Sequence, residues 1–288
     1  MNYYKRTADA LLQDLLDAFG AVLIEGPKWC GKTTTASQLA NSILRMQDPS
    51  MREEYLATAK TKPSILLKGD TPRLIDEWQD APMLWDAVRT TVDDRQIPGQ
   101  FILTGSNAVD KSQIHHSGAG RIARLRMLPM SLWESQESTG EVSLKELFNN
   151  PDYDIDGKMS KMTVEDLIFA ASRGGWPASL LARTPKAQLL VAKNYVQTIC
   201  SDDVSGIDGK KRDAKLTSMI LRAYARNVST LVKKKSLLDD VTSSGEVSCH
   251  VDTFDDYVSA LEKLFVIQNI SAWCPAIRSK TAIRSSVK

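Results

Sequence analysis

Apolar positions along residues 7–127 follow two spacings in turn, which indicates that helices and strands alternate there. Residues 7–19 have apolar side chains three and four positions apart, as an amphipathic helix does, and Gly20 ends the run. Short apolar runs predict buried strands at residues 21–24, 73–76, 100–104 and 122–127. Helical spacing between them predicts helices over residues 32–44 and around residues 84–92. Because strands alternate with helices, we predict an α/β fold with a parallel sheet covered on both faces.

The pattern changes after Glu134. Residues 135–163 are polar and rich in turn-forming residues, whereas the chain from residue 164 onward is mostly helical in its spacing. The strongest stripe runs from Phe254 to Phe265, with apolar positions three, four and seven apart. The apolar residues that follow, up to Ile270, favour a short strand. The sequence therefore predicts an α/β part followed by a mainly helical part.

The segment from Gly26 to Thr33 fits the pattern G-x-x-x-x-G-K-[ST], which cradles phosphate in nucleotide-binding proteins. Its two glycines let backbone N–H groups point inward around an anion, and the helix that follows directs its positive end to the same place. Lys32 supplies a cation for the β- and γ-phosphates, and the Thr33 hydroxyl is suited to hold Mg²⁺. The residues expected to bind the nucleotide are Gly26, Pro27, Lys28, Trp29, Cys30, Gly31, Lys32, Thr33 and Thr34.

Asp76 and Glu77 follow the second predicted strand. This places them at the carboxyl edge of the sheet, where ligands bind in α/β proteins. Asp76 is then placed to hold Mg²⁺, directly or through water, and Glu77 to polarise the attacking water as a general base. An acidic pair also ends many strands that have no catalytic role. The position one strand beyond the phosphate loop favours the catalytic interpretation.

Two further segments carry side chains suited to phosphate chemistry. The third predicted strand ends in Thr104, Gly105, Ser106 and Asn107, whose polar side chains would face the γ-phosphate. Ser106 or Asn107 would position the attacking water or sense the γ-phosphate, although these residues are also typical of an ordinary turn. Arg121 follows two glycines, and an arginine there would neutralise the charge that develops in phosphoryl transfer, in its own chain or in a neighbour. Cys30 lies beside Lys32, which would favour an oxidisable thiolate, although a small side chain that fits the loop is the simpler interpretation.

Composition narrows the class of protein. The chain has 288 residues, enough for two domains, with 42% hydrophobic and 25% charged residues, as in an ordinary globular protein. Its formal net charge of +2 is too small for a protein that coats nucleic acid. The four cysteines show no CxxC spacing, which argues against a zinc site or a disulfide framework. The same cysteine usage leads us to expect a reducing cytoplasm. No apolar run approaches the ~18 residues that span a bilayer, so we expect no membrane partner.

Several motifs together resemble one family. They are GPKWCGKTT (26–34), LIDEWQ (74–79), ILTGSN (102–107), HSGAGR (116–121), MSLWES (130–135) and RGGWP (173–177). In this combination the chain resembles the prokaryotic AAA-type ATPases of the AAA+ superfamily that carry an uncharacterised C-terminal region. The resemblance extends over nearly the whole chain, and the tryptophans of the first two motifs make it specific.

The resemblance implies a domain organisation and a strand order. It implies a P-loop sheet of the AAA+ type with strand order 5-1-4-3-2 in residues 1–135, a helical connector over residues 136–205 and a winged-helix-like α+β module over residues 206–288. In such proteins a further C-terminal domain follows. The resemblance therefore implies that this chain ends before that domain.

A winged helix suggests contact with DNA, but the residues argue for caution. The predicted helix over residues 253–265 carries Asp255, Asp256 and Glu262 on its polar face, and acidic groups repel a duplex. The basic residues of this part are Lys210, Lys211, Arg212, Lys215, Arg222, Arg226, Lys233, Lys234 and Lys235. We therefore favour an interaction surface for a protein partner over residues 206–288, and DNA binding stays a less favoured alternative.

The motifs lead to one main hypothesis and two alternatives. The main hypothesis is a Mg²⁺-dependent ATPase that binds ATP and ADP and acts as a nucleotide-driven switch. The absence of an N/TKxD element, which reads guanine, favours adenine. The alternatives are a binding module that nucleotide stabilises with little turnover, and a nucleic-acid-binding regulator. An arginine that acts on a neighbouring chain would require an oligomer, which the sequence leaves open.

Overall fold

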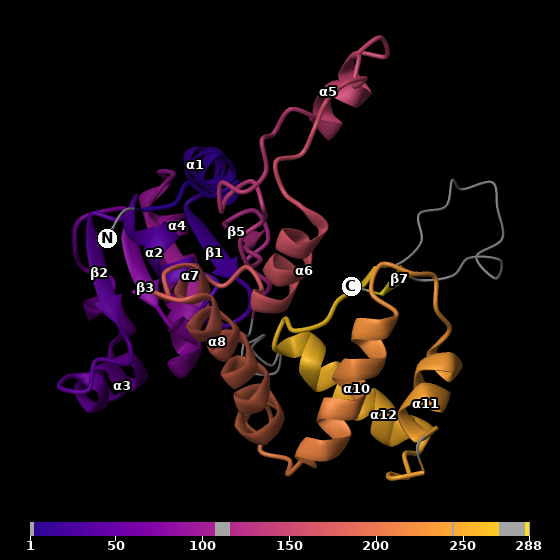
Figure 1. The fold of residues 1–288 in the computed structure, drawn as a ribbon. Helices are drawn as coiled ribbons and strands as arrows, with labels where there is room; N and C mark the ends of the chain where they lie inside the picture. Colours follow the sequence, from indigo (N-terminus) through magenta and orange to yellow (C-terminus); the bar gives the residue numbers. More distant parts are fainter. Residues whose placement is uncertain (1–2, 107–115, 244, 271–285, 288) are drawn as a thin grey trace, which may run out of the picture. The chain divides into compact units, whose positions relative to one another are not determined.

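The structure is a computed structural model, and it describes residues 3–106, 116–243, 245–270 and 286–287 (Figure 1). Contacts divide the chain into two compact units, one of residues 1–105 and 109–193 and the other of residues 106–108 and 194–288. The expected boundaries after residues 135 and 205 rest on the resemblance and stay a prediction.

The first unit is built on a five-stranded parallel sheet with the order β2-β3-β4-β1-β5. The strands are β1 (Ala21–Glu25), β2 (Ser42–Arg45), β3 (Arg73–Asp76), β4 (Phe101–Gly105) and β5 (Ile122–Arg126). In the register of the sheet, Ala21 of β1 lies opposite Phe101 on one side and Ile122 on the other. The order 5-1-4-3-2 implied by the resemblance is therefore confirmed.

The predicted helix over residues 32–44 is wrong in its second half. Helix α2 (Lys32–Ser37) ends after six residues, and Ser42–Arg45 form the edge strand β2. Side chains fix the start of β2 against the segment before β3, since Asn41 donates to the carbonyl oxygen of Thr71 and Ser42 to that of Asp70, each at 2.6 Å. A short apolar run such as Ile43-Leu44 fits either element, and periodicity alone cannot separate the two.

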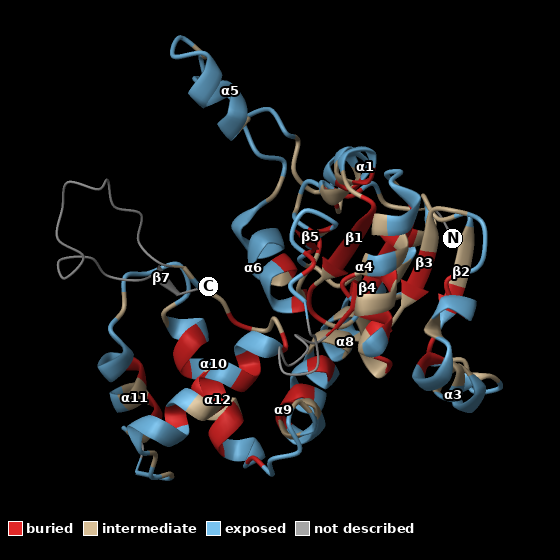
Figure 2. Cartoon of the chain, turned by 180° about the vertical axis from the view of Figure 1, so that it is seen from behind, coloured by how far each residue is buried: buried red, intermediate tan, exposed pale blue. Residues whose placement is uncertain are grey.

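Helices cover both faces of the sheet, as predicted. Alternate strand residues point to opposite faces, so Leu23, Ile75 and Leu103 pack with α3 (Arg52–Thr61) and α4 (Met83–Arg95), which contribute Ala59 and Trp85 among others. Their strand neighbours on the other face pack with α1 (Ala8–Ala18) and α2. Figure 2 shows that buried residues concentrate along the strands. The loops that leave the sheet therefore start from a rigid base.

Four helices follow the sheet, and the last of them continues into the second unit. They are α5 (Leu144–Asn149), α6 (Val164–Arg173), α7 (Pro177–Leu180) and α8 (Pro185–Thr198). A reciprocal capping box starts α6, because the Thr163 hydroxyl accepts from the Asp166 backbone at 3.1 Å and the Asp166 carboxylate accepts from the Thr163 backbone at 3.0 Å. None of the helices in the described part of the chain has the length and apolar character to cross a bilayer.

The second unit is mainly helical. Its elements are a π-helical turn (Ile199–Asp203), α9 (Val204–Gly206), α10 (Ala214–Arg226), α11 (Lys234–Thr242), α12 (Val251–Lys263), and an antiparallel pair of β6 (Asn269–Ile270) with β7 (Ser286–Val287). The predicted helix over residues 253–265 is confirmed as α12, which buries Phe254, Tyr257 and Leu261. The short strand expected near Ile270 is confirmed as β6. The winged-helix assignment stays a prediction.

Candidate nucleotide-binding site

The predicted phosphate loop connects the end of β1 to the start of α2. A Cβ on Gly26 would lie 2.0 Å from the carbonyl oxygen of Met127, so only glycine fits where the loop passes the chain after β5. Gly31, the residue before α2, has a φ of 101°, which favours glycine as well. Trp29 has a φ of 64° and is 61% exposed. The two glycines of the motif are thus explained by the backbone they must form.

The Lys32 ammonium lies inside this loop. Its Nζ donates to the carbonyl oxygens of Gly26 at 2.9 Å and Pro27 at 2.8 Å, and the residue is 5% exposed. Burial lowers the pKa of Lys32 from its ordinary value, while the charges of Cys30, Glu77 and Asp76 act in the opposite direction. The loop therefore holds a positive charge close to the acidic end of β3.

Cys30 is buried in the same loop. It is 0% exposed, and burial raises the pKa of its thiol despite the nearby charges of Lys32 and Arg6. A raised pKa disfavours the reactive thiolate. The structure thus favours the simpler interpretation of Cys30, that of a small side chain that fits the loop.

Asp76 joins three elements at the carboxyl edge of the sheet. Its Oδ1 accepts a hydrogen bond from Thr33 Oγ1 at the start of α2 and another from Thr104 Oγ1 on β4, both at 2.6 Å. The two residues predicted to hold Mg²⁺, Thr33 and Asp76, therefore lie together. Thr104 was expected to face the γ-phosphate, and its hydrogen bond to Asp76 was not predicted. The register, which sets Asp76 opposite Thr104, is the signal that would have found it.

Glu77 leaves the strand with an unusual backbone. Its φ of 57° lies in the left-handed region that non-glycine residues rarely adopt, and a 3-10 turn (Trp78–Asp80) starts directly after it. The Glu77 amide donates to Thr104 Oγ1 at 3.4 Å. The carboxylate of Glu77 accepts a hydrogen bond from Gln79 Nε2. Backbone strain of this kind gathers at functional sites, so it is consistent with the predicted role of Glu77.

Two other predicted residues follow β4. Ser106 comes directly after the strand and is buried, at 4% exposed. Asn107 lies outside the described residues. The roles expected for both stay predictions.

Arg121 lies at the opposite end of the strands from the phosphate loop. It precedes β5, and its carbonyl oxygen accepts from the backbone of Ala21, the first residue of β1, at 3.1 Å. Its guanidinium pairs with Asp93 of α4 at 2.8 Å. Because β1 and β5 run parallel, Arg121 lies at the amino ends of the strands, whereas the phosphate loop lies at their carboxyl ends. The catalytic role expected for Arg121 stays a prediction.

A buried ion pair that the sequence reasoning did not single out supports the loop from behind. Arg6 Nη1 donates to the carbonyl oxygen of Cys30 at 2.6 Å, and Nη2 donates to that of Leu128 at 2.7 Å. Its Nε pairs with Glu134 at 3.1 Å, and both side chains are 4% exposed. Glu134 belongs to the MSLWES motif, and this motif is the sequence feature that could have indicated a role for Glu134.

The acidic face of α12 is used within the second unit. Asp256 pairs with Lys210 at 2.7 Å and with Arg212 at 2.9 Å, and Asp255 pairs with Lys234. Several of the basic residues considered for a nucleic-acid backbone are therefore compensated. Asp255 and Asp256 of α12 are compensated as well.

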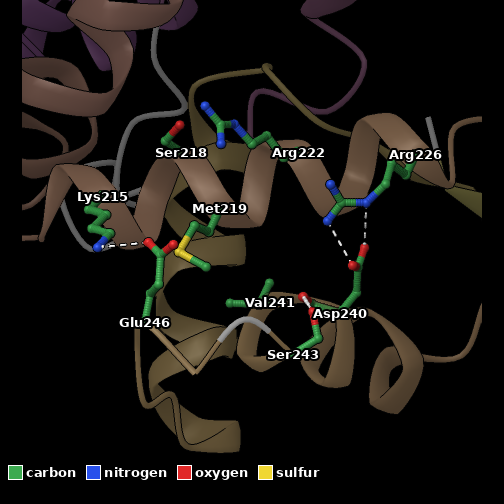
Figure 3. Close-up of a pocket in the computed structure, with 9 residues that line it drawn as sticks. All are labelled: Lys215, Ser218, Met219, Arg222, Arg226, Asp240, Val241, Ser243 and Glu246. Carbon is green, nitrogen blue, oxygen red and sulfur yellow. Dashed lines mark hydrogen bonds and ion pairs between the residues drawn. The ribbon is translucent and has the colours of Figure 1, made fainter.

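A cavity of about 590 Å³ lies along α10 and α11 (Figure 3). Figure 3 shows an ion pair toward each end, Lys215 with Glu246 at 2.9 Å and Arg226 with Asp240 at 2.7 Å. The cavity is lined by Lys215, Ser218, Met219, Arg222, Arg226, Asp240, Val241, Ser243 and Glu246. Its three cations face two anions, so it carries little excess charge.

Comparisons with known proteins match two parts of the chain. Residues 18–136 match the family model described as AAA domain, and residues 164–288 match a domain of unknown function (DUF8612). Two curated relatives, each named as an uncharacterized protein, come from Mycobacterium tuberculosis (strain H37Rv) and Mycobacterium bovis. Each is 25% identical over 279 residues, which are 93% of this chain and 54% of the relative. The chain thus spans about half the length of the curated relatives it matches.

A solved structure shares the fold. The Walker-type ATPase PABY2304 of Pyrococcus abyssi superposes with a TM-score of 0.51 at 13% identity, over 92% of this chain and 91% of that chain. At that identity the likeness supports the fold alone. The strand order, the loop after β1 and the acid after β3 define a P-loop NTPase fold. Residues 18–136 are similar to AAA domains.

Proposed function

We propose that this protein is a Mg²⁺-dependent ATPase whose nucleotide cycle acts as a switch. The observation that carries the proposal is the 2.6 Å hydrogen bond between Thr33 and Asp76, beside a loop that encloses Lys32. This bond places the loop that is suited to bind phosphate next to Asp76, the acid that is suited to bind the metal. The nucleotide phosphates would lie on the loop formed by residues 26–34.

The donor set fits Mg²⁺. Thr33 Oγ1 and Asp76 Oδ1 are hard oxygen donors, and Mg²⁺ is usually held by one or two protein groups together with substrate phosphates and waters. No cluster of three or more His, Cys, Asp or Glu side chains exists among the residues that the structure describes. This favours a cation shared with phosphate. When bound, Mg²⁺ would neutralise charge on the phosphates.

Glu77 would act on the attacking water. It follows Asp76 directly, and its carboxylate is an acceptor for a water proton. Ser106 and Asn107 would sense the γ-phosphate from the end of β4. Arg121 would act on the phosphates bound to a neighbouring chain. Its contribution to hydrolysis would therefore require an oligomer.

The output of the switch would be read by a partner protein in the cytoplasm. The segment proposed to contact that partner is residues 206–288, most of the second unit. ATP is the proposed nucleotide, on the absence of a guanine-reading motif. The winged-helix module over these residues remains part of the proposal.

Two variants test the hydrolysis. Lys32→Ala removes the cation within the loop, so we expect ATP affinity to fall by at least about tenfold, a loss of about 1.4 kcal/mol. Glu77→Gln keeps the shape but not the base, so we expect ATP to bind as in the wild type and kcat to fall by about 10²-fold or more. Lys60→Ala, an exposed lysine in the last turn of α3, serves as control and should change neither. Wild-type turnover in Glu77→Gln would overturn the mechanism.

The binding-module alternative predicts a different result. Nucleotide would then raise Tm by mass action without measurable phosphate release. Measuring Tm and phosphate release on the same wild-type sample separates the two functions, since only the ATPase releases phosphate in proportion to time.

A further inference from the structure

Gln79 lies two residues beyond Glu77, in the same 3-10 turn. Its Nε2 donates to the Glu77 carboxylate. The other atom of the amide, Oε1, is buried and has no hydrogen-bond partner. Buried amide oxygens are almost always paired, because leaving water without a new partner is unfavourable. An apolar side chain of the same size would avoid that loss, so stability alone does not explain a glutamine here.

The orientation of the amide follows from the charge beside it. A carboxylate only accepts hydrogen bonds, so the N–H side of Gln79 must face Glu77. Turning the amide over would set two acceptor groups against each other. Oε1 is therefore directed away from Glu77, and its missing partner is the consequence of the bond to Glu77.

The end of β4 makes room for this amide. A Cβ on Gly105 would lie 3.0 Å from Gln79 Oε1 and 3.1 Å from Trp78 Nε1. The amide thus packs against the backbone beside Thr104, the residue that bonds Asp76. Gln79 is fixed to the same strand end that holds the rest of the acidic site.

Glu77 needs such a constraint. Its left-handed backbone places it at the start of the turn, and the positive charge of Lys32 attracts its carboxylate toward the loop. A general base acts only when it is aimed at the proton it accepts, and a displacement of about 1 Å lowers the rate by about 10²-fold.

We propose that Gln79 is a positioning residue, whose amide N–H holds the Glu77 carboxylate in line for the attacking water. This inference rests on the proposed ATPase function. It assigns to Gln79 an effect on kcat that is exerted entirely through Glu77. Binding of the nucleotide, which depends on the loop and Lys32, does not depend on it.

The test compares Gln79→Met with the wild type. Methionine keeps the length but removes both polar atoms, so Tm should stay the same or rise. We expect kcat for ATP to fall by about 10–100-fold, as for a misaimed base, with KM and nucleotide Kd within about twofold. The matched control is Gln47→Met, which removes an amide that bonds Asp80 of the same turn at 3.5 Å. It should leave kcat within about twofold.

A double variant separates positioning from other roles. In a Glu77→Gln background, Gln79→Met should lower kcat no further, because the two residues act as a unit. An equal further loss in that background, or wild-type kcat in Gln79→Met alone, would overturn the inference. A wild type that releases no phosphate would overturn the proposed function itself, and this is seen before any variant is made.

Discussion

Arg6 reaches across the first unit to the phosphate loop, where its Nη1 lies 2.6 Å from the carbonyl oxygen of Cys30. The same guanidinium is paired with Glu134 behind the loop. The N-terminal segment therefore fixes the position of residue 30, between the two glycines of the motif.

We expect Arg6→Ala to destabilise the protein by about 3 kcal/mol, because it leaves the buried Glu134 without its cation. Nucleotide binding should weaken too, since the loop loses its anchor at Cys30. Urea unfolding and ATP titration measure the two effects. Arg52→Ala removes an exposed arginine 3.8 Å from Asp80 and should change stability by less than about 0.5 kcal/mol. Equal stabilities for Arg6→Ala and the wild type would contradict the anchoring role.

Gly26→Ala tests the close approach of the loop to the chain after β5. A Cβ there would lie 2.0 Å from a backbone oxygen at Met127, which no rotamer can relieve. We expect a loss of about 1–3 kcal/mol in stability and clearly weaker ATP binding. Gly206→Ala is the matched control, since nothing lies within 4 Å of a Cβ on this glycine in α9. It should leave stability unchanged or raise it by up to about 1 kcal/mol. Thermal unfolding of both variants with and without ATP measures their stability and their nucleotide binding.

Much of this site could be predicted from the sequence. The motif from Gly26 to Thr33 specifies a phosphate-binding loop after a strand, and Asp76 ends a second apolar run. Both therefore lie at the carboxyl ends of parallel strands. Because that edge is shared by all strands, Thr33 and Asp76 could be expected to meet without any coordinates. The strand order itself came only from the family resemblance, since local spacing does not tell which strand lies next to which.

The rest depended on contacts between distant residues. Ile43 and Leu44 fit a helix or a strand, and their pairing with β3 decided for the strand. Nothing in the local sequence indicates that Arg6 meets Glu134, because 128 positions separate the two. Arg121 was assigned by its glycine neighbours, although the direction of β5 places it at the amino ends of the strands. Periodicity describes one element at a time and carries none of this information.

The ion pair between Arg212 and Asp208 predicts an acid-sensitive second unit. The Arg212 hydrogen bonds lower the pKa of Asp208 to about 2, from an ordinary 3.8. Since the folded-state pKa lies below the unfolded-state value, the pair contributes fully above about pH 4 and is lost as the pH falls toward 2. We expect Asp208→Asn to be less stable than the wild type at pH 6, and this difference to shrink at pH 2.5.

Circular dichroism of thermal unfolding at both pH values measures this difference. Asp239→Asn, an exposed aspartate on α11, should behave as the wild type throughout. A difference between Asp208→Asn and the wild type that stays constant with pH would show that the carboxylate charge does not matter.

The charges of the second unit predict weak contact with DNA. Lys210, Arg212, Lys215, Arg226 and Lys234 are held by carboxylates in the same unit. Counterion release requires cations that can leave their partners for phosphate, so the paired residues contribute little. We expect no saturable binding of a labelled duplex by the full chain at 50 mM salt, measured by fluorescence anisotropy. Saturable binding that weakens with salt, and that is lost when the exposed Lys233 and Lys235 are changed to Glu, would favour the nucleic-acid-binding regulator instead.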